Sequence, residues 1–374
     1  MIDVGIITIH RINNYGSIFQ AYALQRVCED MGYKTEIIDY CFPNIQHANN
    51  KYITKYDLLP KEPLVLKLLF CYALWKQHWK ISRFVNNYQN LSDNRYNSPE
   101  DLISNPPRYD VYITGSDQLW NPRHCNGDPA FLLHFAPEKA LKISYAASFG
   151  VKDIPQSLHF LYKKLLDRYS FISVREASGV ELVRNIVGKN AIEVLDPTLL
   201  LSFNEWNKIA SPNRQFKKKY ILCYFLNYSY SAFPYVDKLA EYMQKQTGYE
   251  IIRVARPPQK LWISHTHYRV GASPEEFLAL VRDAEMILTT SFHGTAFAVN
   301  YGKPVFTIVQ DRFASDSRQV SLMHNLGLDN QVLSINDVMP DKIRFSYDIQ
   351  LVQKRLESLR QRSVDYLKTA LKNE

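Results

Sequence analysis

The sequence is poor in cysteine, and its few cysteines lie far apart along the chain. Five cysteines are scattered along the chain, odd in number and without a CxxC pair: Cys28, Cys41, Cys71, Cys125 and Cys223. We therefore expect no disulfide framework, and reduced thiols in a cytoplasmic protein. A metal site is not expected either, because His10, His124 and His134 have no metal-ligand spacing relative to one another or to the cysteines.

Long apolar runs are also missing. No run reaches the ~18 apolar residues that a membrane-spanning helix needs, and the chain opens directly on a strand pattern, from which we expect no signal peptide. Residues 64–75 are nevertheless apolar nearly all round, and tryptophans and lysines follow at 75–80. Such a helix either lies at the inner face of a membrane as a peripheral contact or packs in the core or in a homo-oligomer interface.

Nucleotide and nucleic-acid signatures are absent as well. The first loop, residues 10–16, carries neither GxGxxG nor a Walker sequence. The net charge of +8 and the pI near 9.0 suit an anionic substrate or an anionic membrane surface. We do not expect nucleic acid as a partner, because the basic residues are spread out and only 217–219 form a run.

Two α/β domains are the expected architecture, since 374 residues exceed one ordinary core. Strand patterns alternate with helix patterns in two series, at 4–9, 35–40, 111–114, 143–147, 171–174 and 192–195, then at 220–226, 250–254, 286–290 and 305–309. This predicts an N-terminal α/β domain over 1–203, a C-terminal α/β domain over 204–345, and an amphipathic helix within 346–374. Two doubly wound, Rossmann-like domains facing across a cleft fit the series best.

The segment 289–296 carries the strongest chemical signal. His293 follows a buried strand pattern and precedes a short helix pattern, which places it at the edge where open α/β sheets bind ligands. Gly294 allows a close approach of the backbone to a ligand, and Thr295 can cap the helix. His293 either transfers a proton beside a bound anion or only hydrogen-bonds within the sheet edge.

Several segments together resemble the polysaccharide pyruvyl transferase family. The matching segments follow the order of the family and span residues 1 to about 330: 12–25 (INNYGSIFQAYALQ), 109–122 (YDVYITGSDQLWNP), 144–150 (SYAASFG), 172–176 (ISVRE), 194–198 (VLDPT) and 291–295 (SFHGT). The resemblance implies a glycosyltransferase-B-like fold. It also implies transfer of a pyruvyl group from phosphoenolpyruvate to a sugar of a bacterial capsule, exopolysaccharide or cell-wall glycan, or to its lipid-linked oligosaccharide precursor, as a ketal.

That chemistry requires fixed positive charge for a phosphate and a carboxylate, together with an acid and a base. The resemblance assigns the catalytic role to His293. It also points to Arg175, at the end of a strand, as a ligand of the donor; the alternative is a salt bridge to Glu176 or Glu181. No cofactor is expected beyond phosphoenolpyruvate itself.

One motif departs from the family. Better-studied branches carry Arg-Leu-His at the last motif, whereas this chain has Ser291-Phe292-His293. Either Arg312 or Arg318 supplies the missing charge, or donor binding differs.

The other candidates lie in loops at strand ends. Asp117, after Ser116, either orients or deprotonates an acceptor hydroxyl or caps a turn. Asn13, Asn14 and Tyr15 are candidates for the acceptor side. Arg253 and Arg256 are weaker candidates for the donor, and the Asp196-Pro197 step is interpreted as an interdomain turn.

Two other functions remain open. The first is a glycosyltransferase with a nucleotide-sugar donor, because one architecture supports several chemistries. The second is a glycan-binding component of a capsule assembly system without enzymatic activity, which would tolerate loss of His293.

Overall fold

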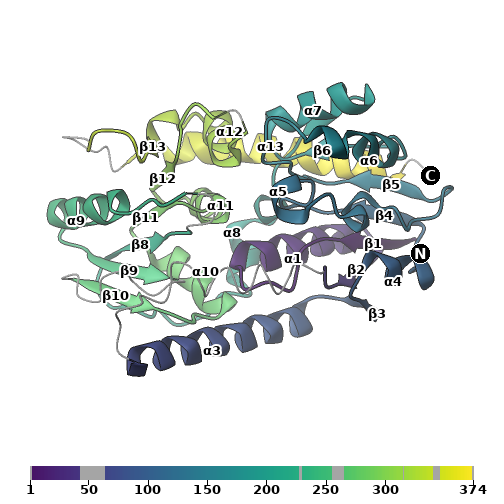
Figure 1. Ribbon diagram of the computed structural model, residues 1–374. Helices are drawn as coiled ribbons and strands as arrows, with labels where there is room; N and C mark the ends of the chain where they lie inside the picture. Colours follow the sequence, from purple (N-terminus) through teal and green to yellow (C-terminus); the bar gives the residue numbers. More distant parts are fainter. Residues whose placement is uncertain are drawn as a thin grey trace.

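The computed structural model describes residues 2–42, 64–226, 230–254, 265–314, 316–339 and 346–372, with the backbone alone for 64–70. The chain forms two parallel sheets placed side by side (Figure 1). This confirms the expected class of two Rossmann-like α/β units.

The first sheet has the strand order β3-β2-β1-β4-β5, with all neighbours parallel. Its strands are β1 (Asp3–Ile7), β2 (Lys34–Tyr40), β3 (Leu91–Tyr96), β4 (Val111–Thr114) and β5 (Leu141–Ser144). The short pair β6 (Ser173–Val174) and β7 (Ile192–Glu193) continues it through single bridges next to β5. The helices of this part are α1 (Tyr15–Asp30), α3 (Leu64–Tyr88), α4 (Pro99–Ser104), α5 (Pro122–Cys125), α6 (Gln156–Leu166) and α7 (Ala177–Val187), with 3₁₀ turns η1 (Pro129–Leu132) and η2 (Pro197–Leu199).

The second sheet has the order β10-β9-β8-β11-β12-β13, again parallel throughout. Its strands are β8 (Tyr220–Tyr224), β9 (Glu250–Val254), β10 (Thr266–Arg269), β11 (Met286–Thr289), β12 (Val305–Val309) and β13 (Val332–Ser334). The helices are α8 (Phe203–Asn207), α9 (Tyr235–Thr247), α10 (Pro274–Asp283), α11 (Phe292–Asn300), α12 (Arg318–Leu326) and α13 (Ile349–Lys372), with the 3₁₀ turn η3 (Asp329–Gln331).

The strands that the sequence pattern does not predict are β3, β10 and β13, which all lie at sheet edges. An edge strand has one open side and needs little apolar sequence. The sequences LSDNRY and THYR accordingly read as polar segments, and VLS is only three residues long.

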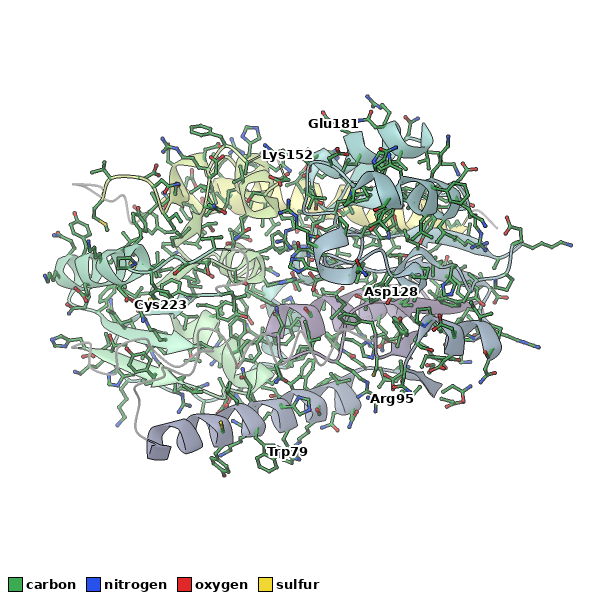
Figure 2. All side chains as sticks on the ribbon, viewed as in Figure 1. Trp79, Arg95, Asp128, Lys152, Glu181 and Cys223 are labelled. Atoms are coloured by element: carbon green, nitrogen blue, oxygen red, sulfur yellow. The ribbon has the colours of Figure 1, made fainter. Side chains whose placement is uncertain are left out.

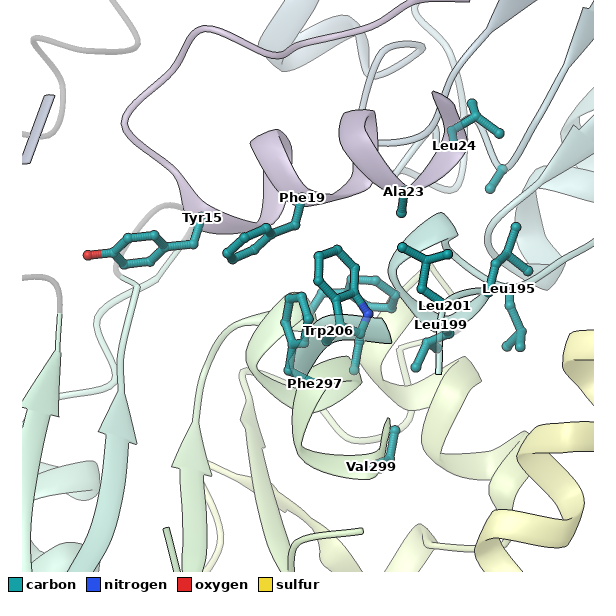
Figure 3. Close-up of a cluster of buried hydrophobic side chains, with 14 of the residues drawn as sticks. Tyr15, Phe19, Ala23, Leu24, Leu195, Leu199, Leu201, Trp206, Phe297 and Val299 are labelled. Carbon is teal, nitrogen blue, oxygen red and sulfur yellow. The ribbon is translucent and has the colours of Figure 1, made fainter. Parts of the chain in front are cut away.

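The two units share one hydrophobic core. Phe19 of α1 contacts the rings of Trp206 from α8 and Phe297 from α11 edge to face, at centroid distances of 5.3 Å and 5.2 Å. Figure 3 shows these rings together, between α1 above and α11 below. Trp206 and Phe297 are fully buried, and one continuous cluster runs from Val4 in β1 to Leu371 in α13. Apolar contact therefore holds the two sheets in a fixed relation.

Two long helices tie the units together. Helix α13 runs from the second unit back to the first, so that both ends of the chain lie beside the first sheet (Figure 1). Its Gln353 donates to Val299 O at 2.6 Å in the second unit, and its Tyr366 donates to Ser144 O at 2.9 Å in the first. Helix α3 precedes β3 in the chain, yet its Lys80 pairs with Glu276 of α10 at 2.8 Å. The domain boundaries at 203 and 345 stay predictions, and α13, which lies within the predicted segment 346–374, contacts both units.

The shared core generates the first prediction. Phe19→Ala removes a ring packed between the two units and should lower the free energy of unfolding by about 3–5 kcal/mol. Phe160→Ala is the matched control, since that ring in α6 is 79% exposed and its loss should change stability by less than about 0.5 kcal/mol. Urea unfolding measures both, and a cost for Phe19→Ala no larger than the control would contradict a shared core.

Candidate functional site

Strand ends from both sheets meet at the carboxylate of Asp196, which follows β7 and is 1% exposed. Its Oδ2 accepts from Arg175 Nη1 at 2.7 Å and from the Ser116 hydroxyl at 2.8 Å, and lies 3.5 Å from Nε2 of His293. Its Oδ1 accepts from the backbone N–H and hydroxyl of Thr198, at 3.0 Å and 2.7 Å. One carboxylate therefore joins β4, β6 and β7 of the first unit to α11 of the second.

The environment keeps Asp196 ionised. Burial by itself would raise the pKa of this carboxyl, but His293, Arg175 and Thr198 together hold the pKa far below its usual range. The sequence assigned Asp196 to an interdomain turn. That interpretation is incomplete: the aspartate does cap η2 through Thr198, but it is also the central acceptor of the cluster.

Arg175 lies directly after β6 and is almost fully buried, at 4% exposure. Besides Asp196, its guanidinium reaches Ser116 Oγ at 3.4 Å, Asp117 Oδ1 at 3.5 Å and the face of Phe292 at 4.6 Å from the ring centroid. Its acidic partners are thus Asp196 and Asp117, not the glutamates that the sequence suggested. Its Nε and Nη2 make no hydrogen bond with any described residue.

His293 lies in the first turn of α11, from the second unit. The helix begins at Phe292, and the Ser291 hydroxyl caps it by accepting from Gly294 N at 3.3 Å. The expectation that Thr295 caps the helix is wrong, because Thr295 already lies in the first turn and its hydroxyl bonds Thr307 Oγ1 at 2.6 Å. His293 is 6% exposed, and its Nε2 makes no hydrogen bond with any described residue.

A glycine from the first unit makes room for the imidazole. Gly16 lies in the first turn of α1, whose cap is Asn14, and a Cβ added to Gly16 would overlap the ring of His293. Gly294, by contrast, is small for a packing reason, since a Cβ there would overlap Thr289 Oγ1. The structure thus shows Gly294 allowing close packing of α11 against β11, and the expected close approach to a ligand stays a prediction.

Asp117 follows β4 and faces the same cluster. Its Oδ2 accepts from the Ser17 hydroxyl at 2.6 Å, and its Oδ1 accepts from Gln118 N at 2.8 Å. Burial raises the pKa of Asp117, but Arg175, His293 and Ser17 outweigh it, so the pKa is lowered. Its backbone is held at φ 82°, which is strained for a residue with a side chain, and such strain gathers at functional sites. Asp117 both caps a turn and faces the cluster.

Of the two arginines in the loop after β12, the structure brings only Arg318 to the cluster. Its guanidinium lies 6.0 Å from the centroid of the Phe292 ring that Arg175 also contacts. Burial and the nearby Arg175 lower the pKa of Arg318 to about 10. Arg312 instead pairs with Asp337 at 3.6 Å on the surface. An anion placed between Arg175 and Arg318 would relieve their repulsion.

The remaining candidates lie outside the cluster. Tyr15 is buried in the core shared by the two units, with its hydroxyl donating to Ala272 O at 2.6 Å. Asn13 hydrogen-bonds His78 of α3 at 2.8 Å, and Asn14 caps α1. Arg253 pairs with Asp237 of α9 and stacks on Phe225 and Phe233. Arg256 lies outside the described residues.

Glu176 is a residue of this region that the sequence analysis named only as a possible salt-bridge partner of Arg175. It is fully buried, and its Oε1 accepts from Ser148 Oγ at 3.1 Å and from the backbone N–H groups of Phe149 and Gly150 at 2.8 Å and 3.0 Å. Its other oxygen has no partner among the described residues. The signal available in the sequence is its position directly after Arg175 at a strand end. Across the described ranges, no group of three histidine, cysteine, aspartate or glutamate side chains is arranged to hold a metal ion.

Known proteins resemble this chain in family and in fold. The family model described as polysaccharide pyruvyl transferase matches residues 14–312. Comparison with curated protein sequences gave no significant match. A Listeria monocytogenes protein assigned as a UDP-N-acetylglucosamine 2-epimerase superposes with a TM-score of 0.50 at 9% identity, covering 99% of this chain and 91% of that chain. This likeness concerns the fold alone. The UDP-GlcNAc 2-epimerase of Methanocaldococcus jannaschii (TM-score 0.49, 13% identity, 95% and 92% covered) and the calicheamicin glycosyltransferase CalG4 (0.46, 11%, 100% and 99%) also match.

The Asp196–Arg175 pair generates a stability prediction. Asp196→Asn leaves the buried guanidinium without its charged partner and should lower the free energy of unfolding by roughly 3–5 kcal/mol. Asp196→Asn combined with Arg175→Met removes both charges and should recover much of that loss. Urea unfolding at neutral pH measures both variants, and equal losses in the two would contradict a coupled pair.

The charge of Asp196 also makes a contribution to folding stability that depends on pH. Because the folded pKa of Asp196 lies below the unfolded value of about 4, its contribution is complete above that value and is lost as the pH falls below it. Stability should therefore fall less steeply below about pH 4 in Asp196→Asn than in the wild type.

The contact between Gly16 and His293 generates a kinetic prediction. Gly16→Ala introduces a methyl group where the imidazole lies, so the ring must move, and turnover should fall at least about ten-fold since small displacements of reacting groups are costly. In a His293→Ala background the same substitution should have little further effect, because the ring is gone. Additive losses in the two backgrounds would show that Gly16 acts independently of His293.

Proposed function

This chain belongs to the polysaccharide pyruvyl transferase family, and from that membership we propose that it transfers the pyruvyl group of phosphoenolpyruvate to a sugar of a bacterial surface polysaccharide or of its lipid-linked precursor. The product is a cyclic ketal on two hydroxyls of the sugar. The observation that carries the proposal is the meeting of His293 and Arg175, from different units, at one carboxylate of Asp196.

The donor would bind between two arginines. Phosphoenolpyruvate carries a phosphate and a carboxylate, and guanidinium groups recognise both with paired N–H donors. Arg175 has two nitrogens without a hydrogen bond to a described residue, one of them 3.5 Å from Asp117, and Arg318 lies on the other unit near the same Phe292 ring. Asp196 already neutralises part of the charge on Arg175, so a second cation is needed for a donor that carries several negative charges.

His293 would act as the acid. Its proton adds to the methylene carbon of the donor and makes C2 cation-like, and a first sugar hydroxyl adds at C2 with loss of its proton. The C2–O bond to phosphate then breaks, and the second hydroxyl adds with loss of its own proton. One of these two protons restores the acid and the other leaves with the phosphate.

The neighbouring carboxylates would support this sequence. Asp196 stabilises the imidazolium before the proton is given, because its charge lies 3.5 Å from Nε2. Asp117, held ionised beside Ser17, is a candidate base for an acceptor hydroxyl. We propose that no metal and no redox cofactor take part, because every step is a proton transfer, an addition or a loss of phosphate.

Two substitutions separate these roles. His293→Gln removes the acid and should lower kcat by about 10²–10⁴-fold while donor binding is largely kept. Arg318→Met removes a charged contact to the donor and should raise its KM by about 10- to 100-fold. Arg312→Met is the matched control, an arginine of the same loop paired with Asp337 on the surface, and should leave both constants unchanged. Phosphate release and product mass measure turnover with lipid-linked sugar acceptors.

Two results would contradict the proposal. Near-normal kcat in His293→Gln would remove the acid assignment, and Asp117 would then be the next candidate. Calorimetric binding of UDP or GDP in place of phosphoenolpyruvate would favour a nucleotide-sugar donor and refute the pyruvyl donor.

A further inference from the structure

The outer face of α3 is an unusual surface. The 25 residues of this helix include four basic residues, Lys67, Lys76, Lys80 and Arg83, and no aspartate or glutamate. In Figure 1 the helix runs along one edge of the molecule, below both sheets. Neither the core nor the candidate site uses its outer side chains.

The inner face of α3 is fixed by contacts with both units. Gln77 donates to the Tyr15 hydroxyl at 2.7 Å, and Lys80 donates to Gly271 O at 3.1 Å and to Glu276 at 2.8 Å. Phe84 and Val85 are buried against the shared core. These contacts fix the rotation of α3 about its own axis, so its other face points to solvent.

That other face carries a stripe of aromatic rings and cations. Tyr72, Trp75 and Trp79 are 58%, 63% and 54% exposed, although tryptophan and tyrosine are usually largely buried. The exposed cations Lys76 and Arg83 lie on the same side, and the Arg83 guanidinium is 5.9 Å from the Trp79 ring centroid. Figure 2 shows Trp79 pointing away from the rest of the molecule. We call Tyr72, Trp75, Lys76, Trp79 and Arg83 the α3 stripe.

We propose that the α3 stripe binds the surface of an anionic lipid bilayer. Tryptophan and tyrosine rings partition to the boundary between headgroups and acyl chains, and lysine and arginine beside them attract anionic headgroups. The absence of acidic residues on the helix and the net charge of +8 give charge complementarity to such a surface. Among the described residues no helix is long and apolar enough to span a bilayer.

A second copy of the chain fits the stripe less well. In a two-fold symmetric contact the stripe would face itself, which brings Lys76 and Arg83 of both copies together with no acidic residue of α3 to neutralise them. A bilayer with anionic lipids supplies that neutralisation. This inference does not depend on the proposed reaction, because vesicle binding needs no turnover.

The test is sedimentation with vesicles, using two sets of variants. Wild-type protein should bind vesicles of phosphatidylcholine mixed with phosphatidylglycerol and not those of phosphatidylcholine alone. Lys76→Gln with Arg83→Gln should lower that affinity by about 25-fold, since each cation near the surface contributes about five-fold. Tyr72→Ser with Trp75→Ser and Trp79→Ser should lower it at least about ten-fold.

Two controls make the result decisive. Phe160→Ser removes a ring of α6 that is even more exposed, at 79%, and should leave vesicle binding unchanged. Cys71 is the only exposed thiol of five, so an environment-sensitive dye can be attached to it. The emission of that dye should shift to the blue with the mixed vesicles and not with phosphatidylcholine vesicles. The paired Lys76 and Arg83 variant alters only exposed side chains, so its fold should be intact by melting temperature.

Three results would overturn the proposal. The first is vesicle binding that survives both sets of substitutions. The second is a dye at Cys71 that does not respond to mixed vesicles. The third is self-association that the three aromatic substitutions abolish in the absence of lipid, which would make the stripe an interface between copies.

Discussion

The ionised carboxylate of Asp196 is the interaction on which the site depends. It is fully buried and has to be satisfied by donors, because an unpaired charge in the interior is costly. Those donors are Arg175, Ser116 and Thr198 of the first unit, and His293 Nε2 of the second unit lies 3.5 Å from the same carboxylate. The groups proposed for donor binding and proton transfer are therefore next to one another at the junction of the two units.

The shared aromatic core holds the two units together next to this carboxylate. Phe19, Trp206 and Phe297 come from α1, α8 and α11, and they belong to one apolar cluster that includes residues of both units, beside a further cluster within each unit. Gly16, one turn before Phe19 on α1, then sets the position of the His293 ring. Helix α1 therefore both packs against the second unit through Phe19 and limits the position of the His293 ring through Gly16.

Helix α3 connects the site with the outer surface. Gln77 on its inner face bonds Tyr15, in the first turn of α1, one residue before Gly16. Its outer face carries the exposed tryptophans Trp75 and Trp79. If the acceptor is carried on a lipid, a bilayer bound at the α3 stripe would hold the protein at the surface where that acceptor lies.

Local pattern determined the parallel strands, the alternation of two α/β series, and the strand-end positions of His293, Arg175 and Asp117, because hydrophobic periodicity and strand-to-helix order are properties of the sequence itself. The edge strands β3, β10 and β13 were not predictable, since the first two are polar and β13 is only three residues long. The tertiary structure alone decided that Asp196 is central, that Arg318 and not Arg312 joins the cluster, and that Tyr15 packs inside the core. Those outcomes depend on which residues of two separate sheets come into contact, and a linear pattern does not record contacts across a domain junction.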